Sequence, residues 1–226
     1  MAKRTLHDKY FRLAKREGYL ARSAYKLIEI DDRRKLIRRG DTVLDLGCAP
    51  GSWMQVASQR VGPNGRVVGI DLLPVGGVIA PNVRTIVGDF TQTPASVLLG
   101  ITESEEETPK RRLANVVLSD MVPNTSGHGD HFMSVRLCHT ILDALPNLLR
   151  PGGSMAMKVF EGETFGELVA RTKAMFHDFK VIKPKATRDI SSEVFVTAKR
   201  FHPPKRERPD DTPDDDSSAE PNRDTP

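Results

Sequence analysis

The chain has few cysteines and no long apolar run, and these absences exclude several classes of protein. Cys48 and Cys138 are the two cysteines among 226 residues, too few for a disulfide scaffold or for a zinc site built on cysteine pairs. No stretch approaches the roughly 18 consecutive apolar residues that a membrane span requires, and residues 1–5 lead into charged sequence without an apolar signal segment. We therefore expect a cytoplasmic protein without a metal site. Its expected oligomeric state is a monomer.

Charge is unevenly distributed along the chain. The net charge is +4, but residues 203–226 hold eight acidic side chains against four basic ones, which leaves 30 basic and 22 acidic residues in 1–202. A basic body favours a polyanionic partner, because each phosphate that it neutralises releases counterions. The solvated surface of many proteins is equally basic, so charge alone leaves nucleic-acid binding open.

The composition divides the chain into three parts. With 38% hydrophobic content, the chain can build one domain with a substantial core and is short for two. We predict a basic N-terminal helical segment over 1–40, one folded domain over 41–202 and a disordered acidic tail over 203–226. Thirteen Lys or Arg lie among the first forty residues, and an amphipathic helix is expected over 20–36 with its cations largely on the exposed face.

Runs typical of strands alternate with runs typical of helices along 41–202. This alternation predicts a doubly wound, Rossmann-like α/β sheet of seven mostly parallel strands with helices on both faces. The last two strands are joined by the short connection 184–192, so they should form an antiparallel pair at one edge. The predicted strands lie near 42–47, 66–72, 83–89, 113–120, 153–160, 179–184 and 193–200, the helices lie near 52–60, 91–99, 133–149 and 164–177, and an acidic surface loop is expected over 103–107.

A strand runs into a glycine turn within residues 43–53, which read VLDLGCAPGSW. The turn, 47–51, ends a strand and opens a helix, which places small residues and free backbone N–H groups where a ligand comes close. Its glycine spacing is G-x-x-x-G, so the dinucleotide fingerprint G-x-G-x-x-G is absent. The turn therefore favours a cofactor without a pyrophosphate and disfavours an oxidoreductase.

Two aspartates follow the next two predicted strands. Asp71 lies about twenty residues beyond the glycine turn, where a carboxylate can accept both ribose hydroxyls of a nucleoside, as it also does in NAD sites. Asp89 ends the third strand and would otherwise cap a helix beginning near Thr91. Because ligands collect at the carboxyl ends of such strands, the agreement of three successive strand ends favours a nucleoside site.

Several motifs point to one family. They are His7-Asp8-Lys9-Tyr10, the glycine turn, Ser119-Asp120-Met121-Val122-Pro123-Asn124 and Lys158-Val159-Phe160, within a match that extends to Phe201. On these residues the chain resembles the FtsJ (RrmJ-type) family of RNA 2′-O-ribose methyltransferases, whose usual second glycine is here Ser52. The resemblance implies S-adenosylmethionine as methyl donor, with the adenine amino group bound by Asp89. The implied cofactor-binding residues are Gly47, Pro50, Gly51, Ser52, Trp53, Asp71, Asp89, Phe90 and Asp120, although Trp53 would otherwise be a core residue.

Methyl transfer to a ribose hydroxyl is an in-line displacement, and a 2′-hydroxyl is a poor nucleophile near neutral pH. The enzyme must orient this oxygen and remove its proton during the attack. The resemblance implies a catalytic tetrad for this step, with Lys158 as proton acceptor and Lys26 as a second cation. Asp120 would hold Lys158, and Glu193 would position the lysines. Taken singly, each has an ordinary alternative as a solvated, turn-forming or edge-strand residue, whereas their joint occurrence favours the tetrad.

Two other kinds of methyltransferase fit less well. Amino-group methyltransferases commonly carry Asn/Asp-Pro-Pro-aromatic after the fourth strand, whereas residues 120–124 lack the paired prolines and the aromatic. Cytosine-C5 methylation needs a nucleophilic cysteine. Cys48 lies in the predicted cofactor loop and Cys138 inside a predicted helix, so neither is well placed, and both are expected to be ordinary core or loop residues.

The basic N-terminal segment is the best candidate for contacts with RNA phosphates, because its cations lie just ahead of Lys26 with aromatic residues between them. The candidate RNA-binding residues are Lys9, Arg12, Lys15, Arg16 and Arg22. The compact size, without an added RNA-binding domain, resembles bacterial members that methylate a uridine ribose of 23S ribosomal RNA in the large ribosomal subunit. Methylation of transfer RNA or messenger RNA caps, and a non-catalytic role in ribosome assembly, remain alternatives.

Overall fold

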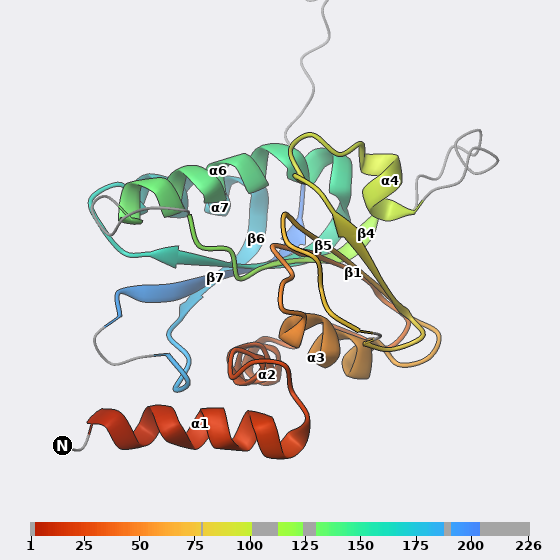
Figure 1. The fold of residues 1–226 in the computed structure, drawn as a ribbon. Coiled ribbons are helices and arrows are strands. Elements are labelled where there is room, and N and C mark those ends of the chain that lie inside the picture. Colours follow the sequence, from red (N-terminus) through yellow and green to blue (C-terminus); the bar gives the residue numbers. More distant parts are fainter. Residues whose placement is uncertain (1–2, 78, 101–112, 124–129, 188–190, 204–226) are drawn as a thin grey trace, which may run out of the picture.

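The computed structural model describes residues 3–77, 79–100, 113–123, 130–187 and 191–203. The predicted acidic loop and nearly all of the predicted tail fall outside these ranges. The strands are β1 (Thr42–Leu46), β2 (Arg66–Asp71), β3 (Val83–Val87), β4 (Ala114–Ser119), β5 (Leu149–Phe160), β6 (Phe176–Ile182) and β7 (Glu193–Phe201). The helices are α1 (Lys3–Glu17), α2 (Ala24–Arg34), α3 (Ser52–Val61), α4 (Ala95–Leu99), α6 (Asp130–Leu148) and α7 (Phe165–Met175) (Figure 1).

The strands form one seven-stranded sheet in the order β3-β2-β1-β4-β5-β7-β6. The pairs from β3 to β5 are parallel, and β7 runs antiparallel to both β5 and β6. Although β7 follows β6 in the chain, it lies between β6 and β5, so β6 takes the edge. The predicted doubly wound α/β sheet with an antiparallel pair at one edge is confirmed.

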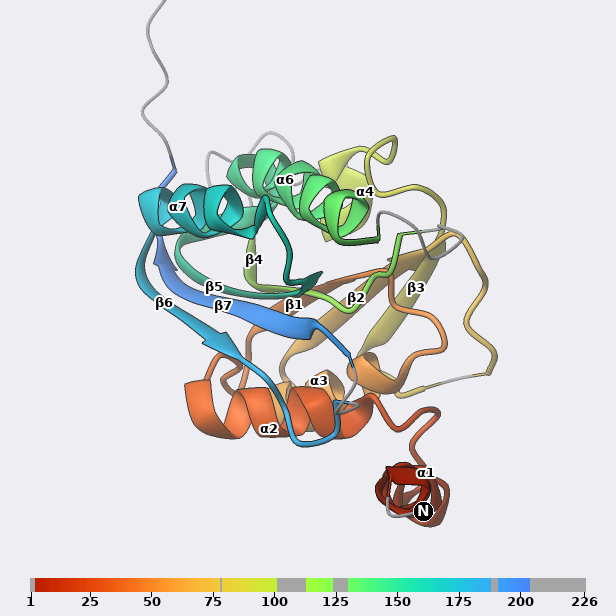
Figure 2. The same ribbon diagram turned by 90° about the vertical axis from the view of Figure 1, so that its left-hand side faces the viewer.

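Two apolar clusters fill the space on either side of the sheet. On one face α4, α6 and α7 cover a cluster that includes Leu44 and Leu142, and on the other α2 and α3 cover a cluster that includes Leu27 and Trp53 (Figure 2). Side chains alternate along a strand, so Val43 of β1 serves the second cluster while its neighbour Leu44 serves the first. Burial on both faces explains the near-continuous apolar runs of β1, β2 and β4.

The second helix differs from its prediction in the exposure of its cations. The helix expected over 20–36 spans Ala24–Arg34. Its cations were expected largely on the exposed face, but two of them, Lys26 and Arg34, are only 7% and 6% exposed. The Arg34 guanidinium donates to the carboxylate of Asp178 on β6 at 2.7 Å. A buried cation needs such a partner. The partners of both cations lie far along the chain, where helical periodicity gives no sign of them.

The helix predicted over 91–99 is shorter, because a turn takes its first residues. The Asp89 carboxylate accepts hydrogen bonds from the backbone N–H and the hydroxyl of Thr91, both at 2.8 Å, and the Asp89 carbonyl accepts the N–H of Thr93. Pro94 then precedes the helix, which spans Ala95–Leu99. Asp89 therefore stabilises a turn at the end of β3, and the helix begins later in the chain.

The first helix lies beside α2 and away from the sheet (Figures 1 and 2). Three aromatic rings join the two helices: the Tyr25 ring centroid is 5.5 Å from that of Tyr10 and 5.7 Å from that of Tyr19. The Tyr25 hydroxyl donates to the Glu17 carboxylate at 2.7 Å. Burial and then this hydrogen bond raise the pKa of Tyr25, so the hydroxyl keeps its proton at neutral pH.

The linker between α1 and α2, residues 18–23, is attached to α3. The side-chain amide of Gln55 donates to the Gly18 carbonyl at 3.0 Å and accepts the Leu20 N–H at 2.8 Å. The Tyr19 hydroxyl donates to Gln59 at 3.1 Å. Because α3 begins at the glycine turn, these bonds connect the predicted cofactor loop with the segment that leads to α2.

Candidate active site

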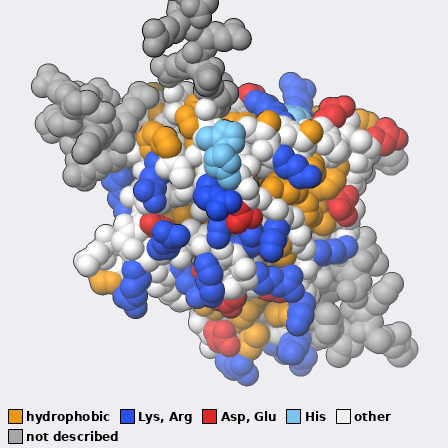
Figure 3. All heavy atoms as spheres, turned by 180° about the vertical axis from the view of Figure 1, so that it is seen from behind, with side chains coloured by type: hydrophobic (Ala, Val, Ile, Leu, Met, Phe, Trp, Pro, Cys, Tyr) orange, Lys and Arg blue, Asp and Glu red, His pale blue; other side chains and the backbone are white. Residues whose placement is uncertain are grey.

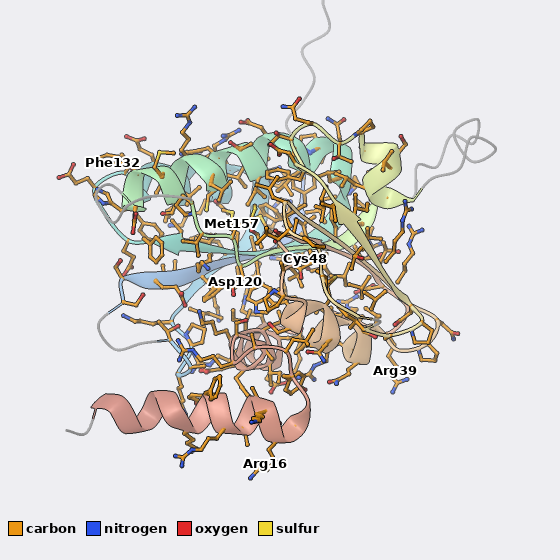
Figure 4. The ribbon with its side chains drawn as sticks, viewed as in Figure 1. Arg16, Arg39, Cys48, Asp120, Phe132 and Met157 are labelled. Atoms are coloured by element: carbon orange, nitrogen blue, oxygen red, sulfur yellow. The ribbon has the colours of Figure 1, made fainter. Side chains whose placement is uncertain are left out.

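The predicted catalytic residues meet at the edge of the sheet where the parallel strands end. Asp120 follows β4, and Lys158 lies near the carboxyl end of β5. The antiparallel direction of β7 brings its first residue, Glu193, to the same edge, and α2 carries Lys26 over that face. In Figure 4, Asp120 lies on the side of the sheet that faces α2 and α3.

Lys158 and Asp120 form a buried ion pair. The register of β4 and β5 pairs Ser119 with Met157, so Asp120 stands beside Lys158. The Lys158 ammonium donates to Asp120 Oδ1 at 2.8 Å and also to the Asp120 backbone carbonyl. The two side chains are 5% and 18% exposed. These two bonds fix the position of the ammonium relative to the end of β4.

Lys26 and Glu193 form a second buried pair. The Lys26 ammonium lies 2.7 Å from Glu193 Oε1, and the two side chains are 9% and 11% exposed. The Thr187 hydroxyl donates to the same carboxylate oxygen at 3.1 Å. Nothing in the sequence pattern indicated Thr187, because it lies in the connection between β6 and β7 and reaches Glu193 only through the fold.

Phe195 lies between the two pairs. It stands opposite Lys158 in the register of β5 and β7, and the Lys26 ammonium is 5.6 Å from the centroid of its ring. Glu193 and Phe195 are two residues apart on one strand, so their side chains point to the same face. The strand period could have shown that these two share a face, but their placement opposite Lys158 depends on a register that the sequence does not reveal.

The arrangement supplies two ammonium groups, each with its own carboxylate, on one face of the sheet. Low exposure strengthens both ion pairs and limits the motion of the side chains. A polar substrate group placed between the pairs can be oriented by hydrogen bonds and can exchange a proton with a lysine. The site can therefore perform acid–base chemistry on a hydroxyl group.

The glycine turn after β1 is closely packed. Gly47 and Gly51 have φ values of 76° and 110°, in the left-handed region that favours glycine. A Cβ on Gly47 would lie 1.9 Å from Met121 Cγ, in the segment after β4. The Ala49 N–H donates to Asp71 at 2.9 Å and so ties the turn to the end of β2. The turn thus brings backbone close to the ends of two neighbouring strands.

Asp45 is a buried carboxyl group beside this turn. It is 1% exposed, and neither carboxylate oxygen has a hydrogen-bond partner among the described residues. Burial, followed by the nearby carboxylates of Asp120 and Asp71, raises its pKa well above the usual range. An orphaned carboxyl group flanked by two others suits a positively charged ligand, and S-adenosylmethionine carries both a sulfonium and an ammonium group.

Ser52 and Trp53, at the start of α3, turn their side chains toward the N-terminal linker. The Ser52 hydroxyl is 2.8 Å from the Ser23 hydroxyl, and the Trp53 indole N–H donates to the Ser23 carbonyl at 2.9 Å. Trp53 is 2% exposed, and its ring centroid lies 5.6 Å from that of Phe195. The Trp53 ring therefore belongs to the core, and its backbone N–H in the first helical turn is what it can offer a ligand.

The predicted nucleoside-binding residues lie at the ends of β2 and β3. The Asp71 carboxylate accepts the N–H groups of Ala49 and Leu73, each at 2.9 Å, so its direction is fixed. Asp89 is exposed, and Phe90 is half-buried against the cluster under α4 and α6. These positions leave Asp89 accessible to a ligand while Phe90 supplies an apolar surface next to it.

The predicted RNA-binding cations lie mainly on α1. The side chains of Lys9, Arg12, Lys15 and Arg16 are exposed, whereas Arg22, in the linker, is half-buried. Arg16 points away from the body of the protein in Figure 4. The face that is turned away in Figure 1 carries many further Lys and Arg side chains (Figure 3). The basic character predicted for the body is thus present on the surface beyond α1.

The two cysteines are buried and free. Burial raises the pKa of the Cys48 thiol and raises that of Cys138 to about 12. The Cys138 thiol donates to the Lys158 carbonyl at 3.2 Å. Neither thiol has the environment of a nucleophile, which depends on the thiolate form.

Among the described residues, no helix is long and apolar enough to cross a membrane.

Comparison with known proteins identifies the family. The model of the FtsJ-like methyltransferase family matches residues 19–201. The chain belongs to this family. One FtsJ-like relative, the ribosomal RNA large subunit methyltransferase E of Azoarcus sp. strain BH72, is 46% identical over 197 residues, which cover 84% of this chain and 90% of the relative. The protein of the same name from Halorubrum lacusprofundi is 43% identical over 194 residues, which cover 85% and 70%. The resemblance seen in the motifs is confirmed.

Solved structures share the fold of this FtsJ-like protein. A crystal structure of a ribosomal RNA methyltransferase from Plasmodium falciparum matches with a TM-score of 0.67 at 29% identity, over 81% of this chain and 98% of that one. Aeropyrum pernix fibrillarin, crystallised with natively bound S-adenosyl-L-methionine, matches with a TM-score of 0.52 over 78% and 76% of the two chains. At 18% identity, the fibrillarin match shows the fold alone.

Proposed function

We propose that this FtsJ-like methyltransferase transfers a methyl group from S-adenosylmethionine to a ribose 2′-hydroxyl of large-subunit ribosomal RNA. The observation that carries the proposal is the juxtaposition of two buried pairs, Lys158 with Asp120 and Lys26 with Glu193, beside the glycine turn. The names of the relatives that cover most of the chain support it. We further propose a uridine of 23S ribosomal RNA in the assembled particle as the target, and a cytoplasmic monomer as the working form.

The residues around the glycine turn fit the methyl donor. S-adenosylmethionine supplies its methyl group on a positively charged sulfonium. The carboxylates of Asp71 and Asp120 match that charge, and a bound cation would favour the ionised form of Asp45, whose oxygens have no hydrogen-bond partner among the described residues. In this proposal Asp71 accepts the ribose hydroxyls, and Asp89 with Phe90 binds the adenine. The residues proposed to line the cofactor site are those predicted from the sequence, with Trp53 acting through its backbone and Asp45 added.

Lys158 and Lys26 have different roles in the proposed reaction. In the proposed mechanism, Lys158 is the base that accepts the 2′-proton, and Asp120 holds its Nζ in place. S-adenosylmethionine, when bound, would supply the methyl group and leave as S-adenosylhomocysteine. Lys26 remains an ammonium bound to Glu193 and stabilises the negative charge that develops on the oxygen. The buried setting makes these interactions stronger than they would be in water.

The basic helix α1 is the proposed RNA-binding element, ahead of the methyltransferase domain proposed over 41–202. Its exposed cations Lys9, Arg12, Lys15 and Arg16, with Arg22 of the linker, would contact phosphates. The linker attached to α3 would then keep this bound RNA in a fixed relation to Lys26. The part of the chain after residue 203 takes no role in this proposal.

Transfer of radiolabel tests the proposal. Purified protein and tritiated S-adenosylmethionine are incubated with large ribosomal subunits, or with transfer RNA, from cells that lack the protein. Ribose-methylation mapping of total RNA from cells with and without it identifies the nucleotide. We expect label in 23S ribosomal RNA and one lost ribose methylation. Label in transfer RNA would show that transfer RNA is a substrate, contrary to the proposed ribosomal target. No label in any RNA would favour a non-catalytic assembly factor.

A further inference from the structure

The Thr187 hydroxyl is directed at the carboxylate that holds Lys26. Its Oγ1 donates to Glu193 Oε1 at 3.1 Å, and the same oxygen accepts the Lys26 ammonium at 2.7 Å. Thr187 and Glu193 are 6% and 8% exposed, so water competes little for either group. Two donors on one oxygen restrict the rotation of the carboxylate more than one donor can. The direction of Glu193 therefore depends on Thr187 as well as on Lys26.

The turn that carries Thr187 is anchored to α2. The Thr187 N–H donates to the Pro184 carbonyl at 2.9 Å and closes the turn. The Lys185 N–H donates to the carboxylate of Glu29 at 2.7 Å. Glu29 lies on α2, about one helical turn after Lys26. The hydroxyl thus reaches Glu193 from a support that is fixed to the same helix as Lys26.

We propose that Thr187 is a positioning residue, whose hydroxyl orients Glu193 so that Glu193 holds the Lys26 ammonium in the site. Its effect on catalysis rests on the proposed 2′-O-methylation, because Lys26 matters there as the cation beside the attacking oxygen. Thr187 itself touches no reacting atom. When the hydroxyl is removed, Glu193 keeps its ion pair with Lys26 but can rotate, and the ammonium follows it.

Three variants test the catalytic consequence. Thr187→Val replaces the hydroxyl by a methyl group, Thr187→Ser keeps it, and Thr197→Val is the matched control. Thr197 is fully buried on β7, and its hydroxyl donates to the Lys180 carbonyl of β6 at 2.9 Å and not to a member of either lysine pair. The control therefore reports the general cost of removing a buried threonine hydroxyl from this part of the sheet.

The measurement is single-turnover methyl transfer to large ribosomal subunits, with S-adenosylmethionine affinity measured by calorimetry. We expect Thr187→Val to slow transfer about tenfold, as for loss of a hydrogen bond to a charged group, with unchanged cofactor affinity. Thr187→Ser should stay within about twofold of the wild type because the hydroxyl is retained. A wild-type rate for Thr187→Val, or equal slowing in Thr197→Val, overturns the proposal.

A second measurement needs no turnover. Acetylation of Lys26 by acetic anhydride, followed by mass spectrometry, reports how well its ammonium is held in the ligand-free protein. Lys26 is protected by its pairing and burial, so Thr187→Val should increase its labelling, while labelling of Lys199, whose side chain is 29% exposed, should not change. Unchanged Lys26 labelling overturns the proposal. If the wild-type protein methylates no RNA but this increase is seen, the proposed function fails and the positioning role stands.

Discussion

Replacing Lys158 by arginine would separate its two roles, holding Asp120 and accepting a proton. An arginine can keep an ion pair with Asp120, but it stays protonated at all working pH values and cannot act as a base. We expect methyl transfer to fall by at least about 10²-fold, the lower end of the effect of a positioned acid or base. That loss corresponds to roughly 2.7 kcal/mol in the barrier, at about 1.36 kcal/mol per factor of ten.

Lys158→Met supplies the opposite perturbation. Methionine fills much of the space but leaves the Asp120 carboxylate, 18% exposed, without its ammonium partner. Breaking a fully buried pair costs about 3–5 kcal/mol, and the partial exposure of Asp120 should reduce this to about 2 kcal/mol. For a chain of this size, the melting temperature would fall by about 4–8 °C. Lys158→Arg should lose less, because the charge that Asp120 needs is retained.

Both variants are compared by single-turnover transfer at saturating S-adenosylmethionine, with cofactor affinity and melting temperature measured in parallel. Lys199→Arg is the matched control, because Lys199 also donates to a backbone carbonyl, that of Arg34, at 3.1 Å. Near-normal cofactor affinity with lost transfer is expected for Lys158→Arg. If this variant turns over at the wild-type rate, Lys158 is not the proton acceptor and the mechanism must be redrawn.

Three further outcomes are expected. Asp89→Ala should weaken S-adenosylmethionine binding by about 1.5–3 kcal/mol if its hydrogen bond to the cofactor is charge-assisted, and unchanged calorimetric affinity would remove Asp89 from the site. Replacing Arg12, Lys15 and Arg16 together by alanine should raise the Michaelis constant for RNA. The slope of log affinity against log salt concentration should flatten by up to about 0.7–0.9 per lost phosphate contact, and a wild-type slope would place the RNA on another face. The raised pKa lets the folded protein keep a proton on Asp45, whereas the unfolded chain releases it above the ordinary aspartate pKa of 3.8. The free energy of unfolding therefore falls as the pH rises from 3.8 toward the raised pKa of the folded state. Asp45→Asn should therefore stabilise the ligand-free protein, by an amount that grows from pH 5 to pH 8 in thermal melts, and a pH-independent difference would contradict the raised pKa.

The parts of the fold that follow from local pattern could be predicted from the sequence. The strands ending at Leu46, Asp71 and Ser119 are buried on both faces, and their apolar runs mark them clearly. The glycine turn after the strand that ends at Leu46 could also be predicted, because Gly47 and Gly51 occupy backbone conformations that other residues rarely adopt. Such features need only a few consecutive residues to be recognised.

Features that depend on distant partners could not be predicted in the same way. Helical periodicity alone does not distinguish Lys26 and Arg34 from solvated cations, and only the family resemblance singled out Lys26. The fold shows that Glu193 and Asp178 stand opposite them. No sequence pattern identified Thr187, because its proposed role depends on one hydrogen bond to Glu193 that only the fold brings about. The tetrad was predicted from the resemblance to a family. The structure adds the register of β5 and β7, which places Phe195 opposite Lys158 and two residues after Glu193.

The attachment of the 18–23 linker to α3 has a consequence for dissecting the protein. Gln55, Gln59 and Trp53 all bond to the linker. The described contacts of α1 with α2 include the ring of Tyr10 against that of Tyr25 and the Glu17 carboxylate that accepts the Tyr25 hydroxyl. A truncation before Gly18 would remove the basic helix α1 and leave the linker bound to α3, the helix that begins at the glycine turn. Helix α1 can therefore be deleted or replaced separately, whereas the linker belongs structurally to the folded domain.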